Sequence, residues 1–271
     1  MNSGPCSKRK INERRKLAPH QPTVVMALRL LCLGLSLQAV DGSHLVWPPP
    51  QHIVAAGAPL RLHPQFAVRT ASPSLALGAA IERHARTTIG PAVAAAAQHP
   101  LDASAALLRE FLLHVLSPDD HLGSATDYSY NLTVTGEAAA VRCPSIYGCM
   151  YGLESFVQLL DTEHGMVVHS SVEITENHIE ITDAPDYVWR GLMVDAGRRF
   201  FPMDTLTDLM TTMVANKLNV LHLHASDYCR FGVESKLYPN LTASLTGIKG
   251  GFYTQSNVKE LIATGKEMGI R

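Results

Sequence analysis

The fold is decided by one stretch, which begins with Gly191-Leu-Met-Val194, continues as a helical pattern and ends with Leu218-Asn-Val-Leu-His-Leu-His224. Both ends are short, largely apolar runs of the kind found in strands that are buried on both faces. Between them, Pro202 and Asp204 open a helix. Its apolar side chains recur at helical spacing, so one stripe can pack on a sheet: Leu206, Leu209, Met210, Met213 and Val214. Strands that alternate with such helices predict parallel βαβ units.

A second strand–helix unit follows the first. Thr254 or Ser256 caps a further helix that ends at Gly269, and Ile270 and Arg271 begin a third strand. Two units of this kind cannot close a barrel, and an open two-stranded parallel sheet would expose its edges and apolar faces. We therefore expect the sequence to be truncated, either in nature or because the gene was read incompletely.

The residues before 187 follow a different pattern. Helix-like and strand-like segments succeed one another there without a fixed period, which predicts a small mixed domain rather than a repeat array. We expect an Ala-rich helix from Ser74 until Gly90-Pro91 interrupts it, and an amphipathic helix over 146–160. Strands are expected over 108–116, 127–134, 138–143, 172–175 and 179–182, the second and third joined as a hairpin.

The first 42 residues read as a leader. Six basic residues within the first sixteen positions precede an almost wholly apolar run over 23–40, which is the order of a signal peptide. Small residues at Ala39 and Gly42 offer cleavage points. An uncleaved anchor is the alternative, because Arg29 interrupts the apolar run, and Met26 is an alternative start. A leader of this kind predicts the secretory pathway, with a lysosomal or extracellular destination.

Composition excludes some classes of protein. With 46% apolar residues and a formal net charge of -1, the chain can bury a core and has no basic field for nucleic acid. Of the five cysteines, Cys6 and Cys32 lie in the leader, which leaves an odd number: Cys143, Cys149 and Cys229. Because no Cys-x-x-Cys pair occurs, we expect each to be a buried thiol. A bond from Cys143 to a cysteine beyond Arg271 stays open.

Two sequons also fit a secretory route. They are Asn131-Leu-Thr133 and Asn240-Leu-Thr242, both candidates for N-glycosylation. Apolar and polar residues alternate from Tyr128 to Val134, which places Asn131 on the polar face of a strand. Such a position is compatible with a glycan, although it is less accessible than a loop.

Three passages together resemble one family of enzymes. Trp189-Arg-Gly-Leu-Met-Val-Asp195, with the following residues as far as Pro202, is similar to the family's first barrel strand and turn. Asn216-Lys-Leu-Asn-Val-Leu-His-Leu-His-Ala-Ser-Asp227 resembles its second strand, and the stretch from Ser145 to Leu160 resembles its accessory domain. By this resemblance the chain is identified as the amino-terminal fragment of a glycoside hydrolase family 20 β-N-acetylhexosaminidase. The implied fold is an α+β accessory domain over 43–186 and the first units of an incomplete (β/α)8 TIM barrel over 187–271.

The resemblance also implies a chemistry. Members of this family release terminal N-acetylglucosamine or N-acetylgalactosamine from glycoconjugates or chitooligosaccharides, with retention of configuration, and the substrate's own 2-acetamido group is the nucleophile. A glutamic acid protonates the leaving oxygen and a neighbouring aspartate orients the acetamido group; neither position is present here. No cofactor is implied, and the full-length protein could be a homodimer. The alternative is a non-catalytic secreted fragment that binds carbohydrate or a partner subunit.

Two residues can be matched to the family's site. Arg190 matches an arginine that binds hydroxyls of the terminal sugar, which suits the fixed donors of a guanidinium. It stands near the start of its strand, however, whereas barrel sites gather at the carboxyl ends, so an ion pair with Asp195 or Asp186 is the structural alternative. Asp227 matches a supporting catalytic carboxylate and lies at a strand end. Its alternative role is a turn-capping aspartate.

The remaining polar residues near these strand ends are expected to be structural. His222 and His224 face one side of their strand, but no third ligand stands at a recognisable spacing, so we predict no metal. A metal-dependent hydrolase is the weakest alternative. Four further residues are expected to fix the upper loops rather than line a sugar pocket: Asp195, Arg198, Arg199 and Glu234. Tyr228 occupies the position where many relatives place a second acid.

Overall fold

The structure, a computed structural model, describes residues 46–271 except 59, 99–105, 118, 161–172, 175–176, 229, 244 and 246–250. It contains a large and a small group of strands with helices packed on them, each with a hydrophobic core of its own. The expected leader over residues 1–42, with Cys6 and Cys32, lies outside the described residues. Within the described part, no helix is long and apolar enough to cross a membrane.

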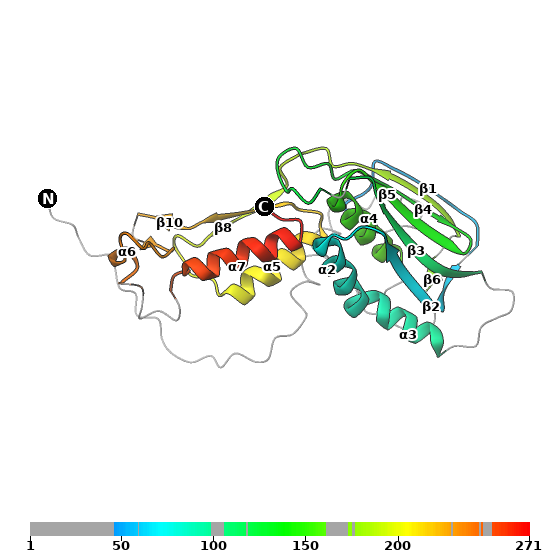
Figure 1. Cartoon of the computed structure of the whole chain (residues 1–271), viewed down its shortest axis with the longest axis horizontal. Helices are drawn as coiled ribbons and strands as arrows, with labels where there is room; N and C mark the ends of the chain where they lie inside the picture. The colour runs from blue at the N-terminus through cyan, green and yellow to red at the C-terminus, as the bar shows by residue number, and fades with distance from the viewer. Residues whose placement is uncertain are drawn as a thin grey trace, which may run out of the picture.

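Seven strands form the amino-terminal sheet, in the order β1-β7-β4-β5-β3-β2-β6 (Figure 1). β3 runs parallel to β2 and β5, and the other neighbouring pairs are antiparallel. The predicted hairpin is present as β4 and β5, whereas β1 and β2 are additional to the prediction. The bounds are β1 His52–Ala56, β2 Leu60–Thr70, β3 Leu107–Val115, β4 Tyr130–Thr135, β5 Ala138–Cys143, β6 Glu173–Ile174 and β7 His178–Asp183.

A helix seals the inner face of this sheet. β4 alternates buried and exposed residues along its length, so Leu132 points into the core while Asn131 faces outward. Helix α4, Ile146–Leu159, packs on β3, β4 and β5, and almost all of its side chains are buried. Phe156 of α4 stacks on Phe111 of β3 with 4.1 Å between ring centroids. Such aromatic contacts contribute about 1 kcal/mol beyond the area they bury.

The Ala-rich helix does not end at Gly90-Pro91, so this part of the prediction is wrong. Helix α2, Leu75–His84, passes through a wider helical turn, η1 Ala85–Ile89, and continues as α3, Gly90–Ala97. Pro91 therefore lies at the second residue of α3, directly after the wider turn.

The carboxy-terminal unit contains two parallel strands and two helices. β8, Gly191–Asp195, pairs with β9, Val220–His224, so that Gly191 faces Val220 and Asp195 faces His224. Helices α5, Met203–Ala215, and α7, Gln255–Glu267, lie side by side in Figure 1 and pack together against these strands. The backbone N–H of Arg271 donates to Asn219 O at 2.9 Å, which places this residue beside β9, although Ile270 and Arg271 are not part of a strand.

Short elements connect β9 to α7. β10, Ser226–Asp227, and β11, Arg230–Phe231, form a small antiparallel hairpin, and α6, Asn240–Ala243, follows. Thr254 caps α7: its hydroxyl accepts from Asn257 N while the Asn257 side chain accepts from Thr254 N. The predicted cap at Thr254 is therefore confirmed.

Cys143 and Cys149 form a disulfide, so the expectation of two buried thiols is wrong. Cys143 ends β5 and Cys149 lies in the first turn of α4, with 5.3 Å between their Cα atoms. That separation is within the range that a disulfide spans. Cys229 lies outside the described residues.

The two parts of the chain meet around a buried lysine. Lys217 lies between α5 and β9, is 4% exposed, and points toward the amino-terminal sheet. Its Nζ donates to Tyr130 OH at 2.9 Å and to Asp183 Oδ2 at 3.3 Å, and Tyr130 OH lies 2.6 Å from Ser155 Oγ. We call these four side chains the Lys217 network.

Candidate functional site

Polar side chains gather where β8 and β9 end. The Arg198 guanidinium contacts Asp195 Oδ2 at 2.5 Å and Asp227 Oδ2 at 2.7 Å, and His224 Nε2 lies 3.1 Å from the same Asp227 oxygen. We call Asp195, Arg198, His224 and Asp227 the strand-end cluster. The carboxyl ends of parallel strands are where barrel and open α/β folds bind their ligands, so this is the candidate site.

The register of β8 and β9 assembles the cluster. Asp195 and His224 are direct partners in the ladder, and Gly197 N donates to His224 O at 2.6 Å. A Cβ at Gly197 would lie 2.8 Å from the carbonyl carbon of Ser226, so only glycine lets the turn approach β10 this closely. The tight turn brings Arg198 over the end of β9.

Asn219 fixes the same register at the opposite end of the strands. Its Oδ1 accepts from the backbone N–H of Arg190 at 2.9 Å, and its Nδ2 donates to Val188 O at 3.0 Å. The buried amide thereby extends the ladder before β8 begins. Because a slip of one residue turns every side chain to the other face, this contact helps to keep Asp195 opposite His224.

The surroundings of Asp227 favour the ionised form of its carboxyl. A hydrogen bond from the backbone N–H of Tyr228 lowers the pKa of the Asp227 carboxyl, with further contributions from His224 and Arg198. Its charge, and its pairing with Arg198, is therefore kept as the pH falls and is lost only on passing this lowered pKa. The Arg198 side chain is 66% exposed, so a ligand in solution can reach it.

Two of the neighbouring residues hold loops, as expected. Glu234 Oε2 accepts from the backbone N–H of Gln255 at 2.9 Å, at the first residue of α7. This negative charge at a helix amino terminus is stabilising. The Arg199 guanidinium lies 6.0 Å from the ring centroid of Phe201 in the turn after β8. The contacts of both residues among the described residues are with loop and helix-end groups outside the strand-end cluster.

Arg190 lies at the other end of β8, where its side chain binds other parts of the protein, and its role in sugar binding stays a prediction. Its Nε donates to Lys217 O at 3.0 Å, its Nη2 to Tyr151 OH at 2.6 Å, and its Nη1 to Tyr187 O. The guanidinium also lies over the Tyr128 ring, 4.8 Å from the centroid. Nor does it form the alternative ion pair with Asp195, which contacts Arg198. Arg190 joins the two parts of the chain.

His222 does not join His224 in a ligand set. Among the described residues, no three His, Cys, Asp or Glu side chains gather closely enough to hold a metal ion. Both glycosylation candidates are exposed: Asn131 on the outer face of β4, with its Oδ1 accepting from Thr182 Oγ1 at 2.9 Å, and Asn240 at the start of α6.

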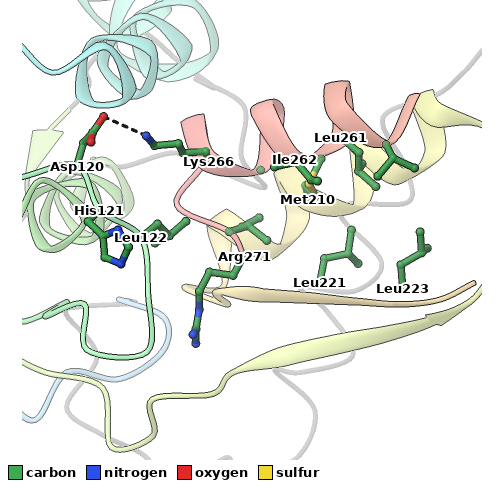
Figure 2. Close-up of a pocket in the computed structure, with 13 residues that line it drawn as sticks. Asp120, His121, Leu122, Met210, Leu221, Leu223, Leu261, Ile262, Lys266 and Arg271 are labelled. Atoms are coloured by element: carbon green, nitrogen blue, oxygen red, sulfur yellow. Dashed lines mark hydrogen bonds and ion pairs between the residues drawn. The ribbon is translucent and has the colours of Figure 1, made fainter. Parts of the chain in front are cut away.

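A groove of 630 Å³ opens away from this cluster, between α7 and β9. Figure 2 shows Leu221 and Leu223 on one wall, Leu261 and Ile262 on the other, and the Asp120–Lys266 ion pair at one end. Its walls are mostly apolar and include no member of the strand-end cluster.

Comparison with known proteins identifies the class. The family described as "Glycosyl hydrolase family 20, catalytic domain" matches residues 187–271, and the one described as "beta-acetyl hexosaminidase like" matches residues 46–159. Both describe glycoside hydrolases. The chain belongs to glycosyl hydrolase family 20, which confirms the resemblance read from its sequence.

Individual relatives agree with this membership. The chain is 38% identical over 162 residues to β-hexosaminidase subunit A2 of Dictyostelium discoideum, covering 60% of this chain and 29% of that protein. It is 35% identical over 144 residues to β-hexosaminidase subunit beta of Entamoeba histolytica, covering 53% and 25%. The solved Flavobacterium johnsoniae chitobiase is 25% identical with a TM-score of 0.67, over 83% of this chain and 33% of that one. The chain thus spans less than a third of the length of these curated relatives.

Proposed function

We propose that the whole protein is an exo-acting β-N-acetylhexosaminidase and that the strand-end cluster forms part of its site for the terminal sugar. The observation that carries this proposal is the exposed Arg198 guanidinium, held between Asp195 and Asp227 at the ends of two parallel strands. Relatives named β-hexosaminidase and a neighbour named chitobiase support the substrate class, a terminal N-acetylglucosamine or N-acetylgalactosamine.

In this proposal Arg198, rather than Arg190, binds the sugar hydroxyls. A guanidinium presents its N–H donors as a rigid fork, which matches two neighbouring hydroxyl oxygens. Ion pairs with Asp195 and Asp227 hold the Arg198 guanidinium in one orientation, while its side chain stays 66% exposed to solvent. The donors of Arg190 bind protein atoms at the opposite end of β8, which supports the choice of Arg198 in this proposal.

Asp227 has a second proposed role as a supporting carboxylate. It contacts both Arg198 and His224, so it can pass the effect of its charge to a neighbouring acid through a hydrogen-bonded chain. The reaction we propose for the whole protein is substrate-assisted and retaining, with the 2-acetamido group as nucleophile. The 271 residues contain no Asp-Glu dipeptide to orient that group and protonate the leaving oxygen. We therefore propose that they bind the sugar without cleaving it.

The fold context we propose is an accessory domain over 43–186 and the first two units of a TIM barrel over 187–271. Parallel pairing of β8 and β9, helices packed against them and Arg271 beside β9 support it. In such a barrel the strand-end cluster would lie at the face where the active site forms.

Sugar binding by the chain tests the proposal. In an NMR titration with N-acetylglucosamine, Arg198→Met is expected to weaken binding by at least about tenfold, since hydrogen bonds to charged groups contribute about 1.5–3 kcal/mol each. Asp227→Asn should weaken it by a smaller factor. The matched control is Arg199→Met, which removes the same charge one residue away and should leave the affinity unchanged.

Two results would contradict the proposal. One is equal affinity of Arg198→Met and wild-type chain for the sugar. The other is turnover of a chromogenic N-acetylglucosaminide by the 271-residue chain above that of a mock preparation, which would show that the missing acid is not needed.

We also propose that the protein enters the secretory pathway, bound for the lysosome or the cell exterior. The leader pattern of the sequence, the exposed sequons and the Cys143–Cys149 disulfide support this, because disulfides persist in oxidising compartments. In chain secreted from a eukaryotic host, Cys143 and Cys149 should resist alkylation until reduced, and glycan removal should lower the mass. Alkylation of both thiols without reductant would argue against this route.

A further inference from the structure

Helices α2 and α4 meet at a buried pair of titratable side chains. His84, the last residue of α2, is 7% exposed, and Glu154, in the middle of α4, is 3% exposed. His84 Nε2 lies 3.4 Å from Glu154 Oε2. This nitrogen is fully enclosed, yet it makes no hydrogen bond with any residue that the structure describes. Buried polar atoms are almost always hydrogen-bonded, so this one calls for an explanation.

The Glu154 carboxylate is fixed from its other side by its own helix. Its Oε1 accepts from Gln158 Nε2 at 3.1 Å, and the same amide group donates to Ala215 O at 3.4 Å. Gln158 Oε1 in turn accepts from the backbone N–H of Trp47 at 2.6 Å. The carboxylate therefore does not depend on a hydrogen bond from His84 for its position.

Burial is the largest influence on the protonation of His84, and it lowers the pKa of the ring. The Glu154 carboxylate opposes this effect, and the neighbouring Arg83 guanidinium adds to it. Glu154 is the charged residue of α4. The other charged side chains of α2 and of η1 and α7, which pack on α2, are exposed to solvent: Glu82, Arg86, Lys259, Glu260, Lys266 and Glu267.

The charge of Glu154 is shared among several cations. It favours the charged forms of Arg83 and of Lys217, whose pKa values burial lowers. A protonated His84 would add another positive charge beside the same carboxylate, in surroundings that hydrate a charge poorly. An ion pair with Glu154 therefore offsets only part of the free energy needed to bury the imidazolium.

We propose that His84 and Glu154 form a proton-sensitive contact between α2 and α4, which is closely packed while His84 is neutral and loosens when His84 takes up a proton in acid. A histidine in an unfolded chain protonates near a pH of about 6.5. As the pH falls below that value, the unfolded state takes up the proton first. The folded state therefore loses stability until the folded His84 is protonated as well. Because α2 also packs on α7, the loosened helix would affect the carboxy-terminal unit too.

Proton uptake by His84 can be followed directly by NMR. The Cε1–H resonance of His84 in the 271-residue chain is expected to titrate with a midpoint below about 6.5, the usual value for histidine. Glu154→Gln removes the charge that favours the imidazolium and should move this midpoint to lower pH. A wild-type midpoint at or above about 6.5, or a move to higher pH in Glu154→Gln, would overturn the inference.

Urea unfolding at a pH of about 7.5 and of about 5.5, on either side of the usual histidine pKa, measures the consequence for stability. The wild-type chain should lose stability at the lower pH, and His84→Gln should lose less, because glutamine stays neutral in both states. The matched control is His178→Gln, which removes a surface histidine that lies 3.5 Å from Glu180 and should show the wild-type loss.

An acid loss as large in His84→Gln as in the wild type would also overturn the inference. If His84→Gln does not fold, the NMR titration of the wild-type chain decides the question alone. Neither measurement involves a sugar, so their outcome is independent of the proposed function.

Discussion

Replacing Lys217 by methionine is expected to lower the free energy of unfolding by about 3 kcal/mol, the cost of breaking a buried ion pair by removing one partner. The ammonium is buried, and its partners are Tyr130 OH and Asp183 Oδ2. Burial lowers the pKa of Lys217, an effect that the charge of Asp183 opposes. Methionine keeps most of the side-chain volume but leaves the Asp183 carboxylate in poorly hydrated surroundings without its cation.

The backbone conformation of Lys217 contributes equally to the stability of the wild-type chain and of Lys217→Met. Its φ is 54°, in the left-handed region, and lysine and methionine pay the same cost there. Its carbonyl oxygen accepts from Tyr151 OH at 2.7 Å and from Arg190 Nε at 3.0 Å in either case. The difference between the two proteins is therefore the ammonium alone.

Urea unfolding followed by circular dichroism measures the effect. Lys266→Met is the matched control, because Lys266 pairs with Asp120 at 3.2 Å on the surface, where such pairs contribute less than about 1 kcal/mol. Adding Asp183→Asn to Lys217→Met should recover part of the loss, since it neutralises the stranded carboxylate. Equal effects of the two lysine substitutions would refute the importance of the Lys217 network.

Replacing Arg190 by methionine is expected to cost a similar amount, about 3 kcal/mol, while leaving the affinity for N-acetylglucosamine unchanged. The substitution removes three donated hydrogen bonds, to Lys217 O, Tyr151 OH and Tyr187 O. It also removes the cation that lies over the Tyr128 ring. None of these partners belongs to the strand-end cluster, which should stay assembled.

Urea unfolding and sugar titration on the same preparation distinguish the stabilising role of Arg190 from the sugar-binding role proposed for Arg198. Arg198→Met is the reciprocal variant, which should lose affinity with little change in stability because its side chain is largely exposed. If folded Arg190→Met fails to bind the sugar while Arg198→Met binds normally, the interpretation from the sequence was right and ours from the geometry is wrong.

Hydrophobic periodicity predicted the carboxy-terminal unit well. β8, α5, β9 and α7 occur close to their expected positions because each has a regular apolar pattern that sheet and helix packing uses directly. β1 and β2 have no such pattern. β1 is an edge strand paired only with β7, and β2 contains Pro64 and shifts its register between Leu62 and Ala67. Proline in a run argues against a strand, and a bulge breaks the alternation.

The site was predicted in part. Asp227 was found because it ends a strand, and the structure places it in the strand-end cluster. Arg198 was expected to fix a loop, and the structure places it in the same cluster, three residues beyond the end of β8. Resemblance favoured Arg190 against that physical rule. The Cys143–Cys149 bond depends on how the end of β5 meets the start of α4, which no spacing of cysteines reveals.

The contacts of Arg190 and Lys217 bear on how inherited variants of such a chain should be interpreted. Both residues lie away from the strand-end cluster, yet both join the two parts of the chain: Arg190 donates to Tyr151 of α4, and Lys217 donates to Tyr130 of β4. A substitution at either residue would leave the sugar affinity of the folded molecules unchanged. It would lower the amount of folded protein in the cell, because a loss of about 1–2 kcal/mol in the free energy of unfolding already changes abundance several-fold. Such a variant would therefore be deficient in the amount of folded protein and not in the affinity of each molecule. A small ligand that binds and stabilises the folded form would raise that amount.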